Sequence, residues 1–172
     1  MKTKYRLAVA LKALMKTTPL DLISVKTLTE KCELNRQTFY YHFRNLYDLL
    51  MWIFLNEKIS TEVADVNEAL DVLITYLEKE HLFIENALNS AAKDLVMEFL
   101  FNKIYNMNLV LLKDDSKEIS KNKVQYHARF LAAGLSNIII TYINEELDIS
   151  LDEILATYKD TFTKTRRELS NA

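Results

Sequence analysis

The spacing of apolar residues along the chain predicts an almost wholly helical protein. Two stripes, Leu46 to Phe54 and Val66 to Leu88, place apolar side chains every three or four residues, as on one face of a helix. One glycine, Gly134, and one proline, Pro19, are too few for β-hairpins or glycine-rich phosphate loops. We expect helices over 4–17, 25–32, 36–43, 46–62, 66–88, 91–112, 121–146 and 151–168.

Polar and charged residues limit the compartment and the class of protein. They interrupt the apolar residues before a run of the roughly 18 needed to span a membrane. Lys12 breaks the apolar run near the N-terminus that would otherwise resemble a secretion signal. The single cysteine, Cys32, offers no intramolecular disulfide, and the polar stretch KDDSKEISKN over 113–122 is the clearest loop. We therefore expect a soluble, cytoplasmic protein.

Charge is distributed unevenly along the chain. The first 48 residues carry nine Lys and Arg against four Asp and Glu, about +5, whereas the remainder carries thirteen against twenty, about −7. This asymmetry suits a head that binds a polyanion on an acidic body, although solvated surface charge alone also produces such an imbalance.

The helices expected over 25–32 and 36–43 are separated by Glu33, Leu34 and Asn35 alone. Ser24 and Asn35 stand at the positions of N-caps, which accept hydrogen bonds from the first turn of a helix. Two short helices with a turn of this length have the spacing of a helix-turn-helix.

The second of these helices offers a polar face that can read DNA. Phe39 and Phe43 lie four residues apart and are expected to face the core. Side chains that donate to base edges and phosphates suit a major-groove reader, but a polar helix face can also belong to a simple packing unit. The residues on the opposite arc and beside it are Arg36, Gln37, Thr38, Tyr40 and Tyr41.

The stretch from Ile23 to Leu50, ISVKTLTEKCELNRQTFYYHFRNLYDLL, resembles the TetR (tetracycline-repressor-like) family of regulators. The match includes TFYYHF at 38–43 and Asp48-Leu49-Leu50 at the start of the next helix. The resemblance implies that Thr38, Tyr40 and His42 hold phosphates, that Arg36, Gln37 and Tyr41 approach bases, and that Lys26 supports them.

This chain departs from the family pattern at two places. Glu33 and Leu34 stand where the family usually turns through a glycine after an alanine, and a residue other than glycine strains such a turn. Leu46 replaces a lysine that often meets a phosphate, so either DNA affinity is weaker or Arg44 substitutes for that lysine. The N-terminal cations Lys2, Lys4 and Arg6 are further candidates for contacts with the DNA backbone, although for each one alone a solvated surface residue is the more common case.

The body, Val66 to Ala172, resembles the C-terminal domains found in regulators of dihydroxyacetone utilisation. The family implies a helical bundle that encloses an effector pocket and dimerises through its last two long helices. A mid-helix glycine costs about 1 kcal/mol relative to alanine, so Gly134 favours a close helix contact, although helical stripes are more often core. The expected interface residues are Leu131, Gly134, Leu135, Ile138, Tyr142, Leu155, Tyr158 and Phe162.

A pocket in the body would need polar side chains within its apolar lining. His81 is the first candidate, although a hydrogen-bonded core histidine explains it better. Glu78 and His81 form one Glu-x-x-His, but the second copy required for a di-iron bundle is missing, so we expect neither a metal nor an enzyme. The other candidates for the pocket are Tyr76, Asn102, Tyr105 and His127.

The sequence thus predicts an all-α bacterial transcription regulator. A three-helix helix-turn-helix domain over 1–48 is joined by a long helix to a regulatory and dimerisation domain over 49–172. Its expected partners are a second copy of itself, a near-palindromic DNA operator, and a small ligand or partner protein that controls DNA occupancy, without a cofactor. The alternative is a protein-interaction adaptor whose head binds DNA weakly.

Overall fold

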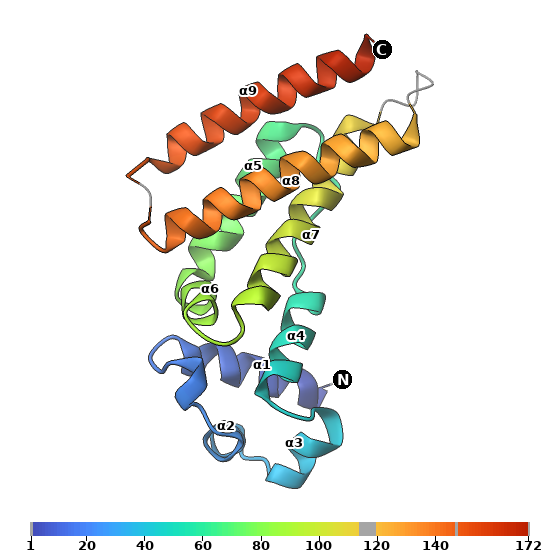
Figure 1. Ribbon diagram of the computed structural model, residues 1–172. Coiled ribbons are helices and arrows are strands. Elements are labelled where there is room, and N and C mark those ends of the chain that lie inside the picture. Colours follow the sequence, from blue (N-terminus) through green and yellow to red (C-terminus); the bar gives the residue numbers. More distant parts are fainter. Residues whose placement is uncertain (1, 114–119, 147, 172) are drawn as a thin grey trace. The chain divides into compact units, whose positions relative to one another are not determined.

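The computed structural model describes residues 2–113, 120–146 and 148–171, and these residues form helices joined by turns and extended segments (Figure 1). The predicted all-α fold is confirmed. The elements are α1 Lys2–Met15, the 3₁₀ turn η1 Leu20–Leu22, α2 Val25–Lys31, α3 Arg36–His42, α4 Leu46–Asn56, α5 Val66–Lys79, α6 His81–Leu88, α7 Lys93–Leu112, α8 Lys121–Ile143 and α9 Leu151–Ser170.

The chain forms two compact units, and each is built from two separate stretches of sequence. The first unit comprises Met1–Lys58 and Glu80–Val96, and the second comprises Ile59–Lys79 and Met97–Ala172. The predicted head over 1–48 therefore shares its unit with α4 and α6.

The first unit is built around α1, which packs against α2, α4 and α6. Leu7 and Leu11 of α1 are fully buried, as is Phe39 of α3. The ring of Phe54 on α4 lies 5.5 Å from the ring of Phe83 on α6, centroid to centroid. This apolar core fixes the short helices α2 and α3, which are too short to be stable alone in water.

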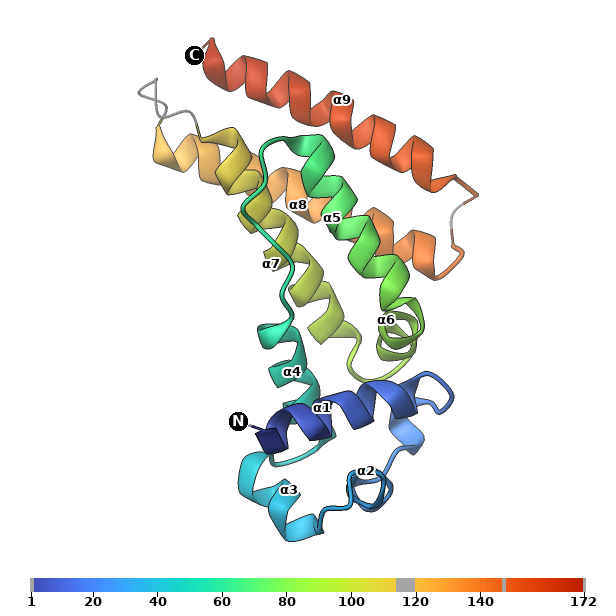
Figure 2. The same cartoon turned by 180° about the vertical axis from the view of Figure 1, so that it is seen from behind.

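The second unit contains the long helices α8 and α9, which lie side by side and antiparallel in both views (Figures 1 and 2). α5 packs against α9. Each helix buries one stripe in this unit, for example Leu135 on α8 and Phe162 on α9. Burial of such a face is the main source of stability for a helical bundle.

The helix predicted over 46–62 is wrong in its second half, because α4 ends at Asn56. The segment that follows buries Ile59 and Val63, half-buries Thr61 and exposes Ser60 and Glu62. Alternate burial with a period of two is the pattern of extended backbone, where successive side chains point to opposite sides. The chain is extended here because its β-branched residues bury every second side chain.

The continuous helix predicted over 66–88 is interrupted at Glu80, which separates α5 from α6. The buried residues Leu70, Leu73 and Leu77 belong to the second unit, whereas Phe83 and Ile84 belong to the first. The break at Glu80 coincides with the point where the chain passes from the second unit to the first.

α7 is the one helix among the described residues that is long and apolar enough to cross a membrane by length and composition, and 44% of its apolar window is buried. The core helix of a soluble protein meets the same criterion. α7 carries Glu98 and Lys103 and buries Leu100 and Ile104, as a core helix does.

Of the loop predicted over 113–122, residues 114–119 lie outside the described residues, and α8 begins at Lys121.

Candidate nucleic-acid interface

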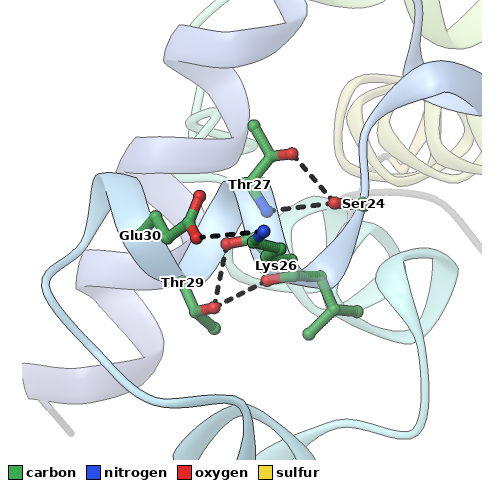
Figure 3. A network of polar contacts seen from close by, with 6 residues as sticks. Ser24, Lys26, Thr27, Thr29 and Glu30 are labelled. Atoms are coloured by element: carbon green, nitrogen blue, oxygen red, sulfur yellow. Dashed lines mark hydrogen bonds and ion pairs between the residues drawn. The ribbon is translucent and has the colours of Figure 1, made fainter.

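The first helix of the predicted helix-turn-helix, α2, is capped by Ser24 as expected. The Ser24 hydroxyl accepts a hydrogen bond from the backbone N–H of Thr27 at 3.0 Å, which satisfies a donor that the first turn leaves unpaired (Figure 3). The buried Thr29 hydroxyl donates to the carbonyl of Val25 at 2.8 Å. These local bonds stabilise the first turns of the short helix.

The turn between α2 and α3 passes through a left-handed residue. Glu33 has φ of 52°, the region that favours glycine. Its N–H donates to the carbonyl of Glu30 at 3.0 Å, and the N–H of Leu34 donates to the carbonyl of Thr29 at 2.9 Å. This pair of bonds is a Schellman motif, and the strain predicted from the missing glycine is confirmed at Glu33.

α3 begins at its predicted cap, because the Asn35 side chain accepts a hydrogen bond from the backbone N–H of Thr38 at 2.7 Å. The Thr38 hydroxyl also donates to Asn35 Oδ1, at 2.9 Å. The Thr38 hydroxyl therefore has a partner within the protein, and its donation to a phosphate requires this hydrogen bond to be exchanged.

The two faces of α3 are divided as the sequence predicts. Phe39 and Phe43 are buried, with 0% and 4% of their surface exposed. Gln37 and Tyr41 are exposed four residues apart, and 85% of the Tyr41 surface is accessible. Residues four apart on a helix share a face, so these two side chains lie on the same outward arc. Arg36 and Tyr40 are also exposed, and Thr38 and His42 are partly buried at the edges of the arc.

The two cations flanking this arc both lie near carboxylates. Lys26 Nζ on α2 is 3.8 Å from Glu30 Oε1, as Figure 3 shows. Arg44 Nε is 4.0 Å from Asp48 Oδ2, while the Arg44 side chain remains 93% exposed. Leu46 is buried in the first unit and contributes to its core. Arg44 is thus the exposed cation available near the start of α4.

The N-terminal cations have roles within the fold that sequence reasoning missed. The Arg6 guanidinium donates to the carbonyl of Cys32 at 2.5 Å, which satisfies the end of α2. Lys4 Nζ lies over the rings of Phe43 and Trp52, 5.4 and 5.9 Å from their centroids. Both cations therefore fix α1 against the helix-turn-helix. Lys2 is exposed.

Burial raises the pKa of the Cys32 thiol, while the positive charges of Arg6 and Lys31 act in the opposite direction. A raised pKa leaves the thiol protonated and unreactive at neutral pH. Cys32 is accordingly a small buried apolar residue at the end of α2, as the sequence predicts.

Comparison with known proteins places this geometry in a family. Residues 64–164 match the family TetR_C_8, described as "Transcriptional regulator C-terminal region", over more than half of the chain. The chain belongs to the TetR family. The family is one of transcriptional regulators that bind DNA and not of enzymes.

One curated relative is the "HTH-type dhaKLM operon transcriptional activator DhaS" of Lactococcus lactis subsp. lactis (strain IL1403). It is 34% identical over 89 residues, which cover 48% of this chain and 47% of that protein. The matched stretch thus spans about half the length of this relative. A solved structure, described as "Dihydroxyacetone kinase operon activator DhaS", aligns with a TM-score of 0.72 and 24% identity over 96% of each chain, and it shows the same fold.

The residues predicted to line an effector pocket of this TetR-family protein are divided between the two units. His81 belongs to the first unit, is 55% exposed, and lies 3.7 Å from the Glu85 carboxylate. The other four belong to the second unit. The Tyr76 ring tilts against Phe99, Asn102 is exposed, Tyr105 stacks on Phe101, and His127 meets the edge of Tyr126.

The second unit does enclose a small polar pair in its apolar core. The Tyr158 hydroxyl donates to Asn108 Oδ1 at 2.5 Å, and burial raises the pKa of Tyr158 so that it stays protonated. The cavity beside this pair has a volume of about 10 Å³, room for about one water molecule. Neither residue was singled out as a pocket candidate, because an asparagine and a tyrosine 50 positions apart give no local signal.

The residues predicted for the dimer interface fall into two sets. Four of them, Leu131, Leu135, Tyr158 and Phe162, are buried within the single chain and contribute to its own core. Their stripe is the inner face of the bundle, since apolar periodicity alone does not distinguish core from interface. Gly134, Ile138 and Tyr142 are exposed on α8, and Leu155 is half-buried on α9.

Proposed function

We propose that this TetR-family protein acts in the cytoplasm as a homodimer whose two α3 helices enter successive major grooves of a near-palindromic operator. The observation that carries this proposal is the exposed arc of Gln37 and Tyr41 on α3, opposite the buried Phe39 and Phe43. A capped helix of this kind, with amide, hydroxyl and guanidinium groups outward, matches the donors and acceptors of base edges.

The proposed contacts fall into two classes. Arg36, Gln37 and Tyr41 approach bases and therefore determine which sequence is bound. Phosphate contacts position the protein without reading sequence, and these are assigned to Lys26, Thr38, Tyr40, His42 and Arg44. Exposure supports the assignment for Lys26, Tyr40 and Arg44, whereas Thr38 must exchange its bond with Asn35.

For the dimer we propose the outer face of α8 as the contact, together with α9 of the second copy. Tyr126 and Phe130 are each 65% exposed on α8, followed on the same side by Gly134. α8 has no acidic residue from Lys121 to Ile143, whereas α9 carries four acidic and four basic residues. An isologous dimer that places α8 against the partner's α9 buries the exposed aromatic surface of α8 twice.

The small cavity beside Asn108 and Tyr158, about 10 Å³, admits no metabolite, because ligand pockets usually measure about 300–1,000 Å³. We therefore propose control by a partner protein or by a small ligand that binds elsewhere. The curated relative is described as the activator of an operon, and the related structure as the activator of a dihydroxyacetone kinase operon. By analogy, we propose that this protein activates genes for dihydroxyacetone use.

Selection of bound duplexes from a random DNA pool, followed by titration of the selected sequence, tests the DNA-binding role. We expect an inverted repeat and an affinity that falls about 10³-fold or more between 50 and 200 mM salt, because counterions are released on binding. Salt-insensitive binding without sequence preference contradicts the proposal and favours the interaction adaptor.

Two kinds of variant separate base contacts from phosphate contacts. Gln37→Ala or Tyr41→Ala is expected to change the preferred sequence, whereas Tyr40→Phe or His42→Ala weakens binding to all sequences alike. Repeating the selection with each variant checks this. A preference that shifts with Tyr40→Phe but not with Gln37→Ala reverses the assignment.

Glu30 offers a test of the role of Lys26. Glu30→Gln removes the carboxylate 3.8 Å from the Lys26 ammonium, so it is expected to tighten binding to every sequence and to steepen the salt dependence. Glu62→Gln, an exposed carboxylate in the extended segment after α4, is the matched control and is expected to leave affinity unchanged. Equal gains in both variants would assign the effect to net charge and not to Lys26.

A further inference from the structure

One lysine of α1 holds two carboxylates from distant parts of the chain. Lys12 Nζ lies 2.5 Å from Glu57 Oε1 and 3.0 Å from Glu80 Oε2. It also lies 4.9 Å from the centroid of the Phe83 ring. The three charged side chains are only 14–19% exposed, and all four residues belong to the first unit. We name Lys12, Glu57 and Glu80 the Lys12 clasp.

The two carboxylates occupy special places in the chain. Glu57 follows the end of α4, one residue before Lys58, where the chain leaves the first unit. Glu80 is the residue at which the chain returns to that unit. The stretch between Glu57 and Glu80 contains all of α5. The residues at both of its ends therefore form ion pairs with the same group, the Lys12 ammonium.

The charge balance of the clasp makes Lys12 indispensable to it. Two carboxylates with little access to water repel each other, and the Lys12 ammonium, which forms an ion pair with each, offsets this repulsion. Any change in the stretch 59–79 that draws its ends apart must break at least one of these ion pairs. Removal of Lys12 takes away the attraction that Lys12 exerts on both carboxylates, which favours separation of the ends.

The same α1 helix is attached to the DNA-reading part and to α6. Near its start, Arg6 donates to the carbonyl of Cys32, which ends α2 just before the turn to α3. At its other end, the Asn86 amide of α6 donates to the carbonyls of Met15 and Thr18 at 2.6 and 2.7 Å. Asn86 Oδ1 also accepts from the N–H of Leu20 at 2.8 Å. A displacement of α6 or of the clasp is thus transmitted to α1 and to the end of α2.

We infer that the Lys12 clasp couples the stretch 59–79 of the second unit to the DNA-reading helix, so that each responds to the state of the other. The inference rests on the proposed DNA-binding function. Coupling between two sites is reciprocal. If a change at α5 alters the free energy of DNA binding, then DNA binding at α3 must alter the stability of α5 by the same free energy. The test therefore does not require the identity of the ligand or partner protein that controls DNA binding.

The experiment measures amide hydrogen exchange along the full chain, with and without the selected operator duplex. In the wild type, the duplex is expected to change exchange in α5 by about fivefold or more, the lower end of usual coupling. Lys12→Met keeps the length and apolar stem of the side chain, and it is expected to abolish this change while protection of α3 by DNA remains. Lys16→Met, an exposed lysine one turn further along, is the matched control.

A second comparison uses the free protein. Lys12→Met is expected to speed exchange in α5 relative to both the wild type and Lys16→Met. Glu80→Gln, which keeps the Lys12 to Glu57 pair, provides a milder form of the same change if Lys12→Met fails to fold. Unchanged α5 exchange in the free clasp variant, or an operator response that survives in it, overturns the coupling. Absence of DNA binding by the wild type instead contradicts the proposed function, and the free-protein comparison still decides whether the clasp holds α5.

Discussion

Two glutamates occupy backbone conformations that favour glycine. Glu33 has φ of 52° after α2 and Glu145 has φ of 56° after α8, and both end their helices in the same hydrogen-bond pattern. A side chain in the left-handed region is unfavourable because its Cβ crowds the backbone. Glu33 lies two residues before the N-cap of the reader helix, and the local hydrogen bonds of the Schellman motif hold the turn in this conformation.

Replacement of Glu33 by glycine is expected to stabilise the protein by about 0.5–1 kcal/mol, because the left-handed strain outweighs the added freedom of the unfolded chain. Urea unfolding followed by fluorescence of Trp52, the single tryptophan, measures this. Glu30→Gly inside α2 is the control and is expected to destabilise by about 1 kcal/mol. A loss of stability in Glu33→Gly would show that the Glu33 side chain makes a contact that matters more than the strain.

At the scale of elements, α9 depends on a reciprocal cap at its start. The Ser150 hydroxyl accepts from the N–H of Glu153, and the Glu153 carboxylate accepts from the N–H and the hydroxyl of Ser150. These hydrogen bonds lower the pKa of Glu153 because they favour its ionised form. Asp65 caps α5 in the same manner, and its pKa is lowered by bonds from the N–H groups of Glu68 and Asn67.

The cap of α9 is expected to depend on pH. A carboxyl group with a lowered folded-state pKa contributes stability above its unfolded pKa and loses it as the pH falls through the folded value. Glu153→Gln should therefore be less stable than the wild type near pH 7, and the difference should shrink as the pH falls below about 4.3, the usual range for glutamate. Urea unfolding at a series of pH values measures it, with Glu168→Gln, near the other end of α9, as the control. A difference that does not change with pH would contradict the role of the carboxylate.

At the scale of the whole molecule, Gly134 lies on the outside of α8 and not in the core. A Cβ atom built at Gly134 meets no atom of the same chain within 4 Å. The close approach inferred from this mid-helix glycine is therefore not made to another helix of the same chain. A substitution at Gly134 is therefore expected to leave the fold of a single chain intact, which makes this position suitable for a test of the proposed homodimer.

Substitution at Gly134 is expected to separate folding from association. Gly134→Ala should raise helix stability by about 1 kcal/mol, because alanine is the better helix former. Gly134→Leu should also fold but should hold the two α8 faces apart, so sedimentation should show monomers where the wild type shows dimers. A Gly134→Leu dimer with an unchanged Kd would place the interface elsewhere on the surface.

Local sequence determined the elements around the reader helix. The caps at Ser24 and Asn35, the strained turn at Glu33 and the division of α3 into Phe39 and Phe43 against Gln37 and Tyr41 all follow from short-range patterns, since caps and helix faces depend on residues within a few positions of each other. The all-α class follows equally from the scarcity of glycine and proline.

Tertiary structure alone decided the features that join distant parts of the chain. The break at Glu80 and the extended segment after Asn56 lie where the chain passes between the two units. Apolar stripes on α8 and α9 carry the same periodicity whether they face the core or a second molecule, so burial of Leu131 and Phe162 had to be observed. The Lys12 clasp unites residues 45 and 68 positions apart from Lys12, and such long-range charge pairs have no signature in local sequence because only the fold brings them together.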